Sequence, residues 1–339
     1  MKKSILLLGF FIINYSFLSV KSLAQNAHPD TVYTGIHVTS IHNIDFRKNE
    51  YSVTFWLWLK YKNKQFDFVK YLEIPQAKDF KLLYSSVDSS NNRIYIVMKL
   101  ECLMKDSWKV GDFPFDRQKL WLTIENSQYP SDSLVFAEDK IDKNYYAKDI
   151  TGKHYYQERS LNGSRGIVGW QIDSFNVSIG KNLYETAFGD TTYDKPLSEY
   201  SDFRVKISIQ HKSQGLFWKM FIGMYLTFLI AYICFYIHAD SIDSRFGLSV
   251  GALFAVMANK YIIDSSLPES TSLTLVDTLH WLTLAFIFAV ITATAYSLKL
   301  VKAKKIKKAN RFDMITAQVL LLIYVILNIY YISQASKGG

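Results

Sequence analysis

Hydrophobic and polar residues alternate along much of the N-terminal part of the chain. In the stretch YSVTFWLWLKYK, residues 51–62, Phe55 and Leu57 fall on one side of an extended chain, and Trp56 and Trp58 fall on the other. This period of two is typical of a strand with one buried face. The same alternation recurs in RIYIVMKL, QKLWLTI, SLVF, GWQIDSFNVSI and DFRVKISIQ.

Turn-forming clusters such as DSSNN and YPSDS separate these strands. Short strands joined by turns, without the spacing of βαβ units, are typical of an antiparallel β-sandwich. We therefore expect residues 25–214 to form an immunoglobulin-like β-sandwich. Cys102 and Cys234 fall in different regions and are not expected to pair, so this domain must rely on its hydrophobic core.

The pattern changes after Gly215, where four long apolar segments follow one another. A helix needs about 20 mainly apolar residues to span a bilayer, and each segment is long enough or becomes so with one added turn. We expect a transmembrane domain, residues 215–339, with four helices at about 215–237, 245–264, 278–299 and 314–333.

The first residues of the chain have the pattern of an export signal. Lys2 and Lys3 precede an apolar run, and the small residues Ser22 and Ala24 follow it. This order is typical of a cleaved signal peptide, here residues 1–24. An uncleaved anchor helix is the alternative, and in either case the segment that follows lies outside the cytoplasm.

The net charge of +9 is concentrated in two places. Three lysines belong to the predicted signal peptide, and seven basic residues without an acid lie between Lys299 and Arg311. A basic segment between two membrane helices is typical of a cytoplasmic loop. We expect residues 300–312 to form that loop and expect no binding to nucleic acid. With four spans, the β-sandwich and the C-terminus then lie on the opposite side of the membrane.

The second apolar segment carries more small and polar residues than the other three. On a helix of 3.6 residues per turn, seven of its residues form one stripe: Asp243, Gly247, Gly251, Phe254, Ala258, Tyr261 and Ser265. A stripe of small residues often packs against a neighbouring membrane helix. Alternatively, the stripe faces water along the axis of a cyclic oligomer, since Asp243, Lys260 and Asp264 are costly to expose to lipid.

The run Phe113-Pro114-Phe115-Asp116-Arg117-Gln118 carries a resemblance. It is similar to the FPFDxQ signature of the pentameric ligand-gated ion channels, the Cys-loop receptor family, and specifically of their prokaryotic branch. Arg245 at the start of the second span and Leu267-Pro268 after it support the resemblance, which covers essentially the whole mature chain.

The resemblance implies a homopentamer in the bacterial inner membrane, with the N-terminal domain and the C-terminus on the extracellular or periplasmic side. Its partners would be membrane lipids, permeant ions, and either protons or an unknown small-molecule agonist that binds the sandwich. The family's paired cysteines would fall at Asp106 and Leu120, so the disulfide bond is missing, as in prokaryotic members.

The resemblance also implies a gating interface between the two domains. Phe113 and Phe115 would be apolar anchors on a turn fixed by Pro114, with Asp116 an interfacial charge beside Arg117. The other residues expected at this interface are Arg47, Leu267 and Pro268. In isolation, the same hexapeptide is also typical of an ordinary β-turn with a surface ion pair.

Two departures from the family concern this interface. We find no proline in the first membrane helix between Gly215 and Ile237. The family also tends to place an arginine at the end of the last strand, where it pairs with the FPFD aspartate. Here Ile209 takes that position, with Lys206 and Lys212 nearby.

Five copies of the second span would line a pore. Asp243 would form a carboxylate ring that selects cations, unless Arg245 points inward and reverses the preference. Phe254 is the largest apolar residue in the middle of the stripe. It is either a hydrophobic gate or an aromatic packed between helices.

The resemblance places the ligand site between subunits, where aromatic residues and a carboxylate could hold an amine. The candidates are Trp58, Phe80, Phe136, Glu138, Tyr184, Phe188 and Tyr193. The seven histidines are scattered, and the chain has no HExxH motif, nucleophile elbow or glycine-rich phosphate loop. We therefore expect no enzyme, cofactor or metal. The alternative to a channel is a non-conducting receptor, a ligand-binding sandwich on a four-helix anchor.

Overall fold

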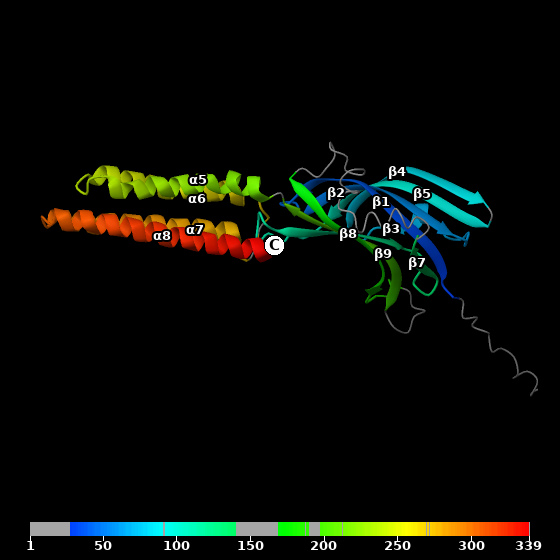
Figure 1. Cartoon of the computed structure of the whole chain (residues 1–339). Coiled ribbons are helices and arrows are strands. Elements are labelled where there is room, and N and C mark those ends of the chain that lie inside the picture. Colours follow the sequence, from blue (N-terminus) through cyan, green and yellow to red (C-terminus); the bar gives the residue numbers. More distant parts are fainter. Residues whose placement is uncertain are drawn as a thin grey trace, which may run out of the picture.

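The computed structural model describes residues 28–90, 92–139, 169–186, 188–189, 197–211, 213–268, 270 and 272–338. Figure 1 shows two parts lying end to end, with the β-strands in one and helices α5 to α8 in the other. This arrangement confirms the predicted fold class, a β-sandwich followed by four membrane helices. The predicted signal peptide, residues 1–24, lies outside the described residues.

Two sheets form the sandwich. The first has the order β4-β5-β2-β1-β7, with strands Ala77–Ser90, Arg93–Lys105, Glu50–Tyr61, Asp30–Asp45 and Leu134–Glu138. The second has the order β3-β6-β9-β8, with strands Leu72–Glu73, Arg117–Asn126, Ser198–His211 and Trp170–Tyr184. The pair β1 and β7 runs parallel and so departs from the expected antiparallel arrangement, which the other described pairs follow. The short helix α2, Phe68–Tyr71, precedes β3.

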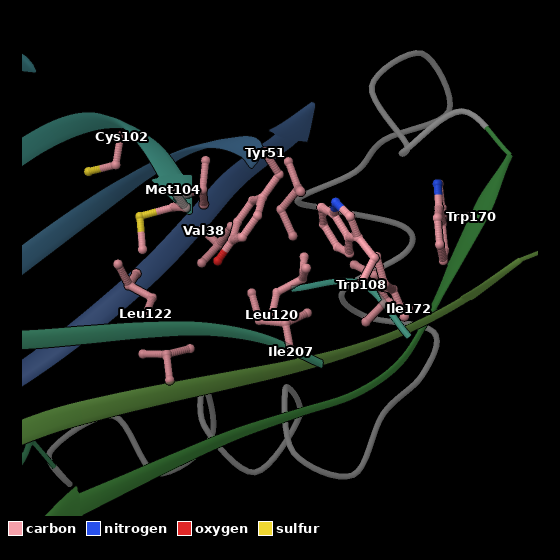
Figure 2. Packing of buried hydrophobic residues seen from close by; sticks show 14 of the residues in the cluster. Val38, Tyr51, Cys102, Met104, Trp108, Leu120, Leu122, Trp170, Ile172 and Ile207 are labelled. Atoms are coloured by element: carbon pink, nitrogen blue, oxygen red, sulfur yellow. The ribbon is translucent and has the colours of Figure 1, made fainter. Parts of the chain in front are cut away.

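The core lies between the two sheets. Figure 2 shows Val38 and Tyr51 of the first sheet pointing towards Leu120, Leu122 and Ile207 of the second. On β2 the buried and half-buried positions alternate from Val53 to Tyr61, as its period of two predicts. Because burying one large apolar side chain contributes about 1.5–3 kcal/mol, this interior can hold the domain together without a disulfide bond.

Strand β4 differs from the others because almost all of its side chains are exposed. It lies at the edge of the first sheet and pairs only with β5 among the described strands. Its exposed apolar side chains are Phe80, Leu82, Leu83, Tyr84 and Val87. An exposed apolar edge strand favours contact with another chain.

Four helices are long and apolar enough to cross a membrane. They are α5 (Ser213–Ile233), which the short 3-10 helix η3 (Cys234–Tyr236) extends, α6 (Ile242–Asp264), α7 (Leu275–Lys302) and α8 (Ile306–Gly338). A capping box made by Thr274 and Asp277 fixes the start of α7. Figure 1 shows the C-terminal end of α8 beside the sandwich, so both lie at the same end of the bundle.

The loop between α7 and α8, within the basic segment, is shorter than predicted. Helix α7 continues to Lys302 and α8 begins at Ile306, so most of the segment expected as a loop at 300–312 is helical. Lysine is a good helix former, which explains the difference. Lys299 and Lys302 lie in the last turn of α7, where positive charge complements the helix dipole.

Candidate functional site

The loop of residues 111–116, here called the FPFD loop, lies between β5 and β6 and contacts the membrane helices. The amide of Leu275 at the start of α7 donates a hydrogen bond of 2.7 Å to the carbonyl oxygen of Gly111. The rings of Phe115 and Phe217 on α5 lie 5.7 Å apart. One loop therefore touches the starts of two membrane helices.

Helix α8 also reaches the FPFD loop. A side chain added at Gly338 would lie 3.3 Å from Asp112 Oδ2. Leu267, which follows α6, packs against the hydrophobic core, and its neighbour in the sequence, Pro268, is half-buried. Helices α5, α7 and α8 thus all contact the FPFD loop at the base of the sandwich.

Asp116, the last residue of this loop, is buried with only 3% of its surface exposed. Its Oδ2 accepts a hydrogen bond from Gln118, and its Oδ1 lies 3.7 Å from His211 Nε2. Burial raises the pKa of Asp116 to about 6, although the hydrogen bond from Gln118 opposes this effect. Arg117 is exposed and forms no ion pair among the described residues, so the surface ion pair of the β-turn alternative is not formed there.

His211 stands at the end of β9 among aromatic rings. It stacks on Trp170 with the ring centres 3.5 Å apart, and Phe113 meets it edge-on at 5.2 Å. Burial lowers the pKa of His211 to about 4. His211 therefore lies beside Asp116, whereas Ile209, where the arginine was expected, is fully buried in the core.

The remaining residues predicted at this interface divide between core and surface. Phe113 is buried against Phe46, and Pro114 is buried beside it. Arg47 is exposed in the turn between β1 and β2. Lys206 lies over the ring of Trp121, 5.4 Å from its centre, so it makes a cation-π contact away from Asp116.

The predicted pore stripe of α6 is uncovered in the single chain. All seven of its residues are exposed: Asp243, Gly247, Gly251, Phe254, Ala258, Tyr261 and Ser265. A Cβ atom added at Gly247 or Gly251 would meet no described atom within 4 Å. These glycines therefore do not serve close packing against helices of the same chain, and the stripe is free to face water or another subunit.

The opposite face of α6 is buried in the bundle and carries Arg245. The guanidinium group of Arg245 donates to Asp313 Oδ2 on α8 at 2.8 Å and to the carbonyl oxygen of Ile237. Ser297 on α7 donates to the same carboxylate oxygen at 2.9 Å. Arg245 thus points away from the stripe, because residues two apart on a helix lie on opposite faces.

The predicted ligand residues lie in separate places on one chain. Trp58 Nε1 donates to Asp139 at 2.9 Å beside a cavity of about 440 Å³. Glu138 lines the neighbouring cavity. Phe136 also lines that cavity, although most of its side chain is buried against Phe68. Phe80 lies apart from these residues on β4.

A second group of predicted residues surrounds a buried carboxylate at the end of β8. Tyr184 and Asn182 each donate a hydrogen bond of 2.9 Å to Glu125, which is 1% exposed. Desolvation by burial raises the pKa of Glu125. Phe188 and Tyr200 lie 5.6 and 5.8 Å from the Tyr184 ring. A carboxylate among aromatic rings has the chemistry to hold an amine. Tyr193 lies outside the described residues.

Comparison with known proteins adds one relative. No profile of a known protein family matches the chain. The proton-gated ion channel of Gloeobacter violaceus is 20% identical in an alignment of 306 positions, which covers 83% of this chain and 77% of the relative. The chain is similar to an ion channel. Because the alignment is longer than the whole sandwich, it includes membrane helices as well.

The similarity and the four apolar helices support a multi-pass membrane protein and a ligand-gated channel in general. Sequence reasoning missed three residues of the sites described above: Glu125, His211 and Asp313. Each is a single titratable residue whose neighbours come from distant parts of the chain, so no local pattern marks it. For Asp313, only the direction of its partner Arg245 could have been predicted. Arg245 is two residues away from both Asp243 and Gly247, so it lies on the face of the helix opposite the stripe.

Proposed function

We propose that this chain is the subunit of a homopentameric ligand-gated ion channel that conducts cations. The observation that supports this best is the uncovered stripe of α6, which begins with Asp243 and continues with glycines, Phe254 and Tyr261. Exposed polar groups on a membrane helix are stable when they face water. A ring of subunits would enclose a water-filled channel along its axis and would also cover the apolar edge of β4.

The direction of Arg245 favours cations over anions. Its charge is neutralised inside the bundle by Asp313, so it does not compete with Asp243 at the mouth of the pore. Asp243 lies in the first turn of α6, where its negative charge interacts favourably with the helix dipole. Five such carboxylates would attract cations to the cytoplasmic mouth.

Charge substitution at Asp243 tests the selectivity. In planar bilayers with a salt gradient, Asp243→Ala should move the reversal potential towards zero, and Asp243→Arg should move it towards the anion equilibrium potential. Asp240→Ala, in the exposed turn before α6, serves as the control and should leave the reversal potential unchanged. Identical reversal potentials in wild type and both Asp243 variants would remove the proposed ring.

The same preparation tests conduction itself. Wild-type protein is exposed to steps of pH and to primary amines on the side of the sandwich. Currents that follow either stimulus support a gated channel. Particles that form no ring and pass no current under either stimulus would instead favour the non-conducting receptor, with the sandwich as its ligand-binding part. In the proposed orientation, the sandwich lies on the extracellular or periplasmic side of the bacterial inner membrane.

Contact between Phe115 and Phe217 should couple ligand binding to the pore. An aromatic pair contributes about 0.5–1.5 kcal/mol beyond its buried area, which corresponds to about two- to tenfold in an equilibrium constant. Phe115→Ala should therefore shift the concentration for half-maximal opening by about that factor. In a double-mutant cycle, adding Phe217→Ala should cause little further change. Fully additive shifts would show that the two rings act independently.

A further inference from the structure

Two buried polar atoms face each other at the base of the sandwich. Asp116 Oδ1 and His211 Nε2 lie 3.7 Å apart, and their side chains are 2% and 7% exposed. Neither atom has a hydrogen-bond partner among the residues that the structure describes. Buried polar atoms are nearly always hydrogen-bonded, so such a facing pair calls for an explanation.

We propose that Asp116 and His211 bind one proton between them and that this proton is a gating ligand of the channel. The inference rests on the proposed function and names the ligand and its site. On binding, a proton from solvent joins the Asp116 carboxylate. The resulting hydroxyl group then donates a hydrogen bond to the neutral imidazole nitrogen of His211.

Neighbouring groups fix both partners in place. The stacked ring of Trp170 and the edge of Phe113 hold the imidazole of His211. Phe46 stacks on the same imidazole at 5.9 Å. Because Gln118 occupies the other carboxylate oxygen of Asp116, only Oδ1 is free to meet His211. When neutral His211 carries its own proton on Nδ1, its Nε2 is an acceptor that faces the acceptor Oδ1 of Asp116. One shared proton completes this arrangement.

The charge states of the two groups support this assignment. With the pKa of Asp116 raised to about 6 and that of His211 lowered to about 4, the pair is a carboxylate and a neutral imidazole above about pH 6. Between these values the pair holds one proton and is neutral. Proton uptake therefore removes one buried negative charge as the pH falls through about 6.

Other charged groups around the pair lie mainly towards the surface. The charge of Asp112 reaches Asp116 and raises its pKa further. The flanking elements also carry partly or fully exposed charged groups. Asp45 and Arg47 lie beside Phe46, Lys109 and Arg117 lie before and after the FPFD loop, and Asp173 lies on β8. At the start of α7, Asp277 is paired with Lys260. No ion pair among the described residues links any of these groups to Asp116.

The position of the pair connects proton binding to the membrane helices. A hydrogen bond of this kind is roughly 2.5–2.9 Å long, so the two atoms must approach by about 1 Å. His211 lies two residues before α5, and Asp116 directly follows Phe115, which contacts α5. Binding of the proton would thus draw the end of β9 towards the FPFD loop at the junction of the two domains.

Two substitutions test the proton site. Asp116→Asn supplies a neutral amide that can donate to His211 at any pH, so it should open the channel at neutral pH to the level that wild type reaches only below about pH 6. His211→Phe keeps the ring packing but removes the acceptor, and should require at least tenfold more protons for half-maximal opening. His42→Gln, on the exposed pair with Glu101, is the matched histidine control and should behave like wild type.

A second measurement does not depend on conduction. Infrared difference spectra of the purified assembly between pH 7 and pH 5 should contain a carboxylic acid band that disappears in Asp116→Asn and shifts in His211→Phe. If both variants assemble but keep the wild-type pH of half-opening within a factor of two in proton concentration, the proposal is overturned. If wild type conducts at no pH, the channel function fails, and the infrared band alone decides whether the pair binds a proton.

Discussion

Asp313→Ala is expected to destabilise the helix bundle by about 3–5 kcal/mol, the typical cost of removing one partner from a buried ion pair. Arg245 and Asp313 have only 2% and 4% of their side chains exposed. Without the carboxylate, the guanidinium group of Arg245 keeps a carbonyl partner at Ile237 but loses the only opposite charge that it pairs with among the described residues. Unfolding of the purified protein in mild detergent, followed by denaturant titration, measures this loss.

The comparison that isolates the charge is a double variant. Arg245→Met with Asp313→Leu removes both charges together, and replacement of a buried ion pair by apolar side chains is often neutral or stabilising. The double variant should therefore recover most of the stability that Asp313→Ala loses. Ser297→Ala removes one hydrogen bond to Asp313 and should cost about 1 kcal/mol. A loss below 1 kcal/mol for Asp313→Ala would contradict a buried, essential pair.

Phe254→Ser is expected to raise the resting conductance of the reconstituted channel at least tenfold in the absence of any stimulus. Phe254 is 64% exposed in the single chain and stands on the same stripe as Gly251 and Tyr261. Five phenyl rings around an axis would narrow the lumen and expel water, which blocks ions without a charge barrier. A serine at this position removes both the bulk and the apolar surface, so water and ions can enter.

A matched substitution separates the gate from general damage to the helix. Leu248 is 36% exposed on α6 but lies roughly a third of a turn away from the stripe. Leu248→Ser should therefore leave the resting conductance close to that of wild type. If Phe254→Ser opens normally on stimulation but shows no resting leak, Phe254 is a packing residue and the gate lies elsewhere.

The parts of the fold that could be predicted are those with a repeating pattern. The alternation on β2 and the four apolar segments each repeat over many residues, so a single odd position does not hide them. Strand β4 has no such pattern, because almost every side chain on it is exposed and no face is buried within the chain. Its pairing with β5 follows from the sheet and is not visible in its own sequence.

The candidate site was predicted less completely, for a related reason. Phe113 and Phe115 belong to a recognisable hexapeptide, whereas His211, which faces Asp116, comes from the last strand and is distant in the sequence. His211 meets the FPFD loop only because β9 pairs with β6 and β8, which sets Trp170 opposite His211. A lone histidine before a membrane helix gives no sign of this register. The sequence alone led us to expect Asp116 beside Arg117, whereas its Oδ1 faces His211 and Arg117 is exposed.

The open space in front of Gly247 and Gly251 has a consequence for any measurement of stability. A subunit whose uncovered surfaces meet their counterparts only in a ring reaches its full resistance to unfolding when the ring is intact. Dilution or a dissociating detergent would then lower the apparent melting temperature even though no contact within the chain has changed. Thermal data from preparations at different protein concentrations are comparable only after the fraction assembled has been determined.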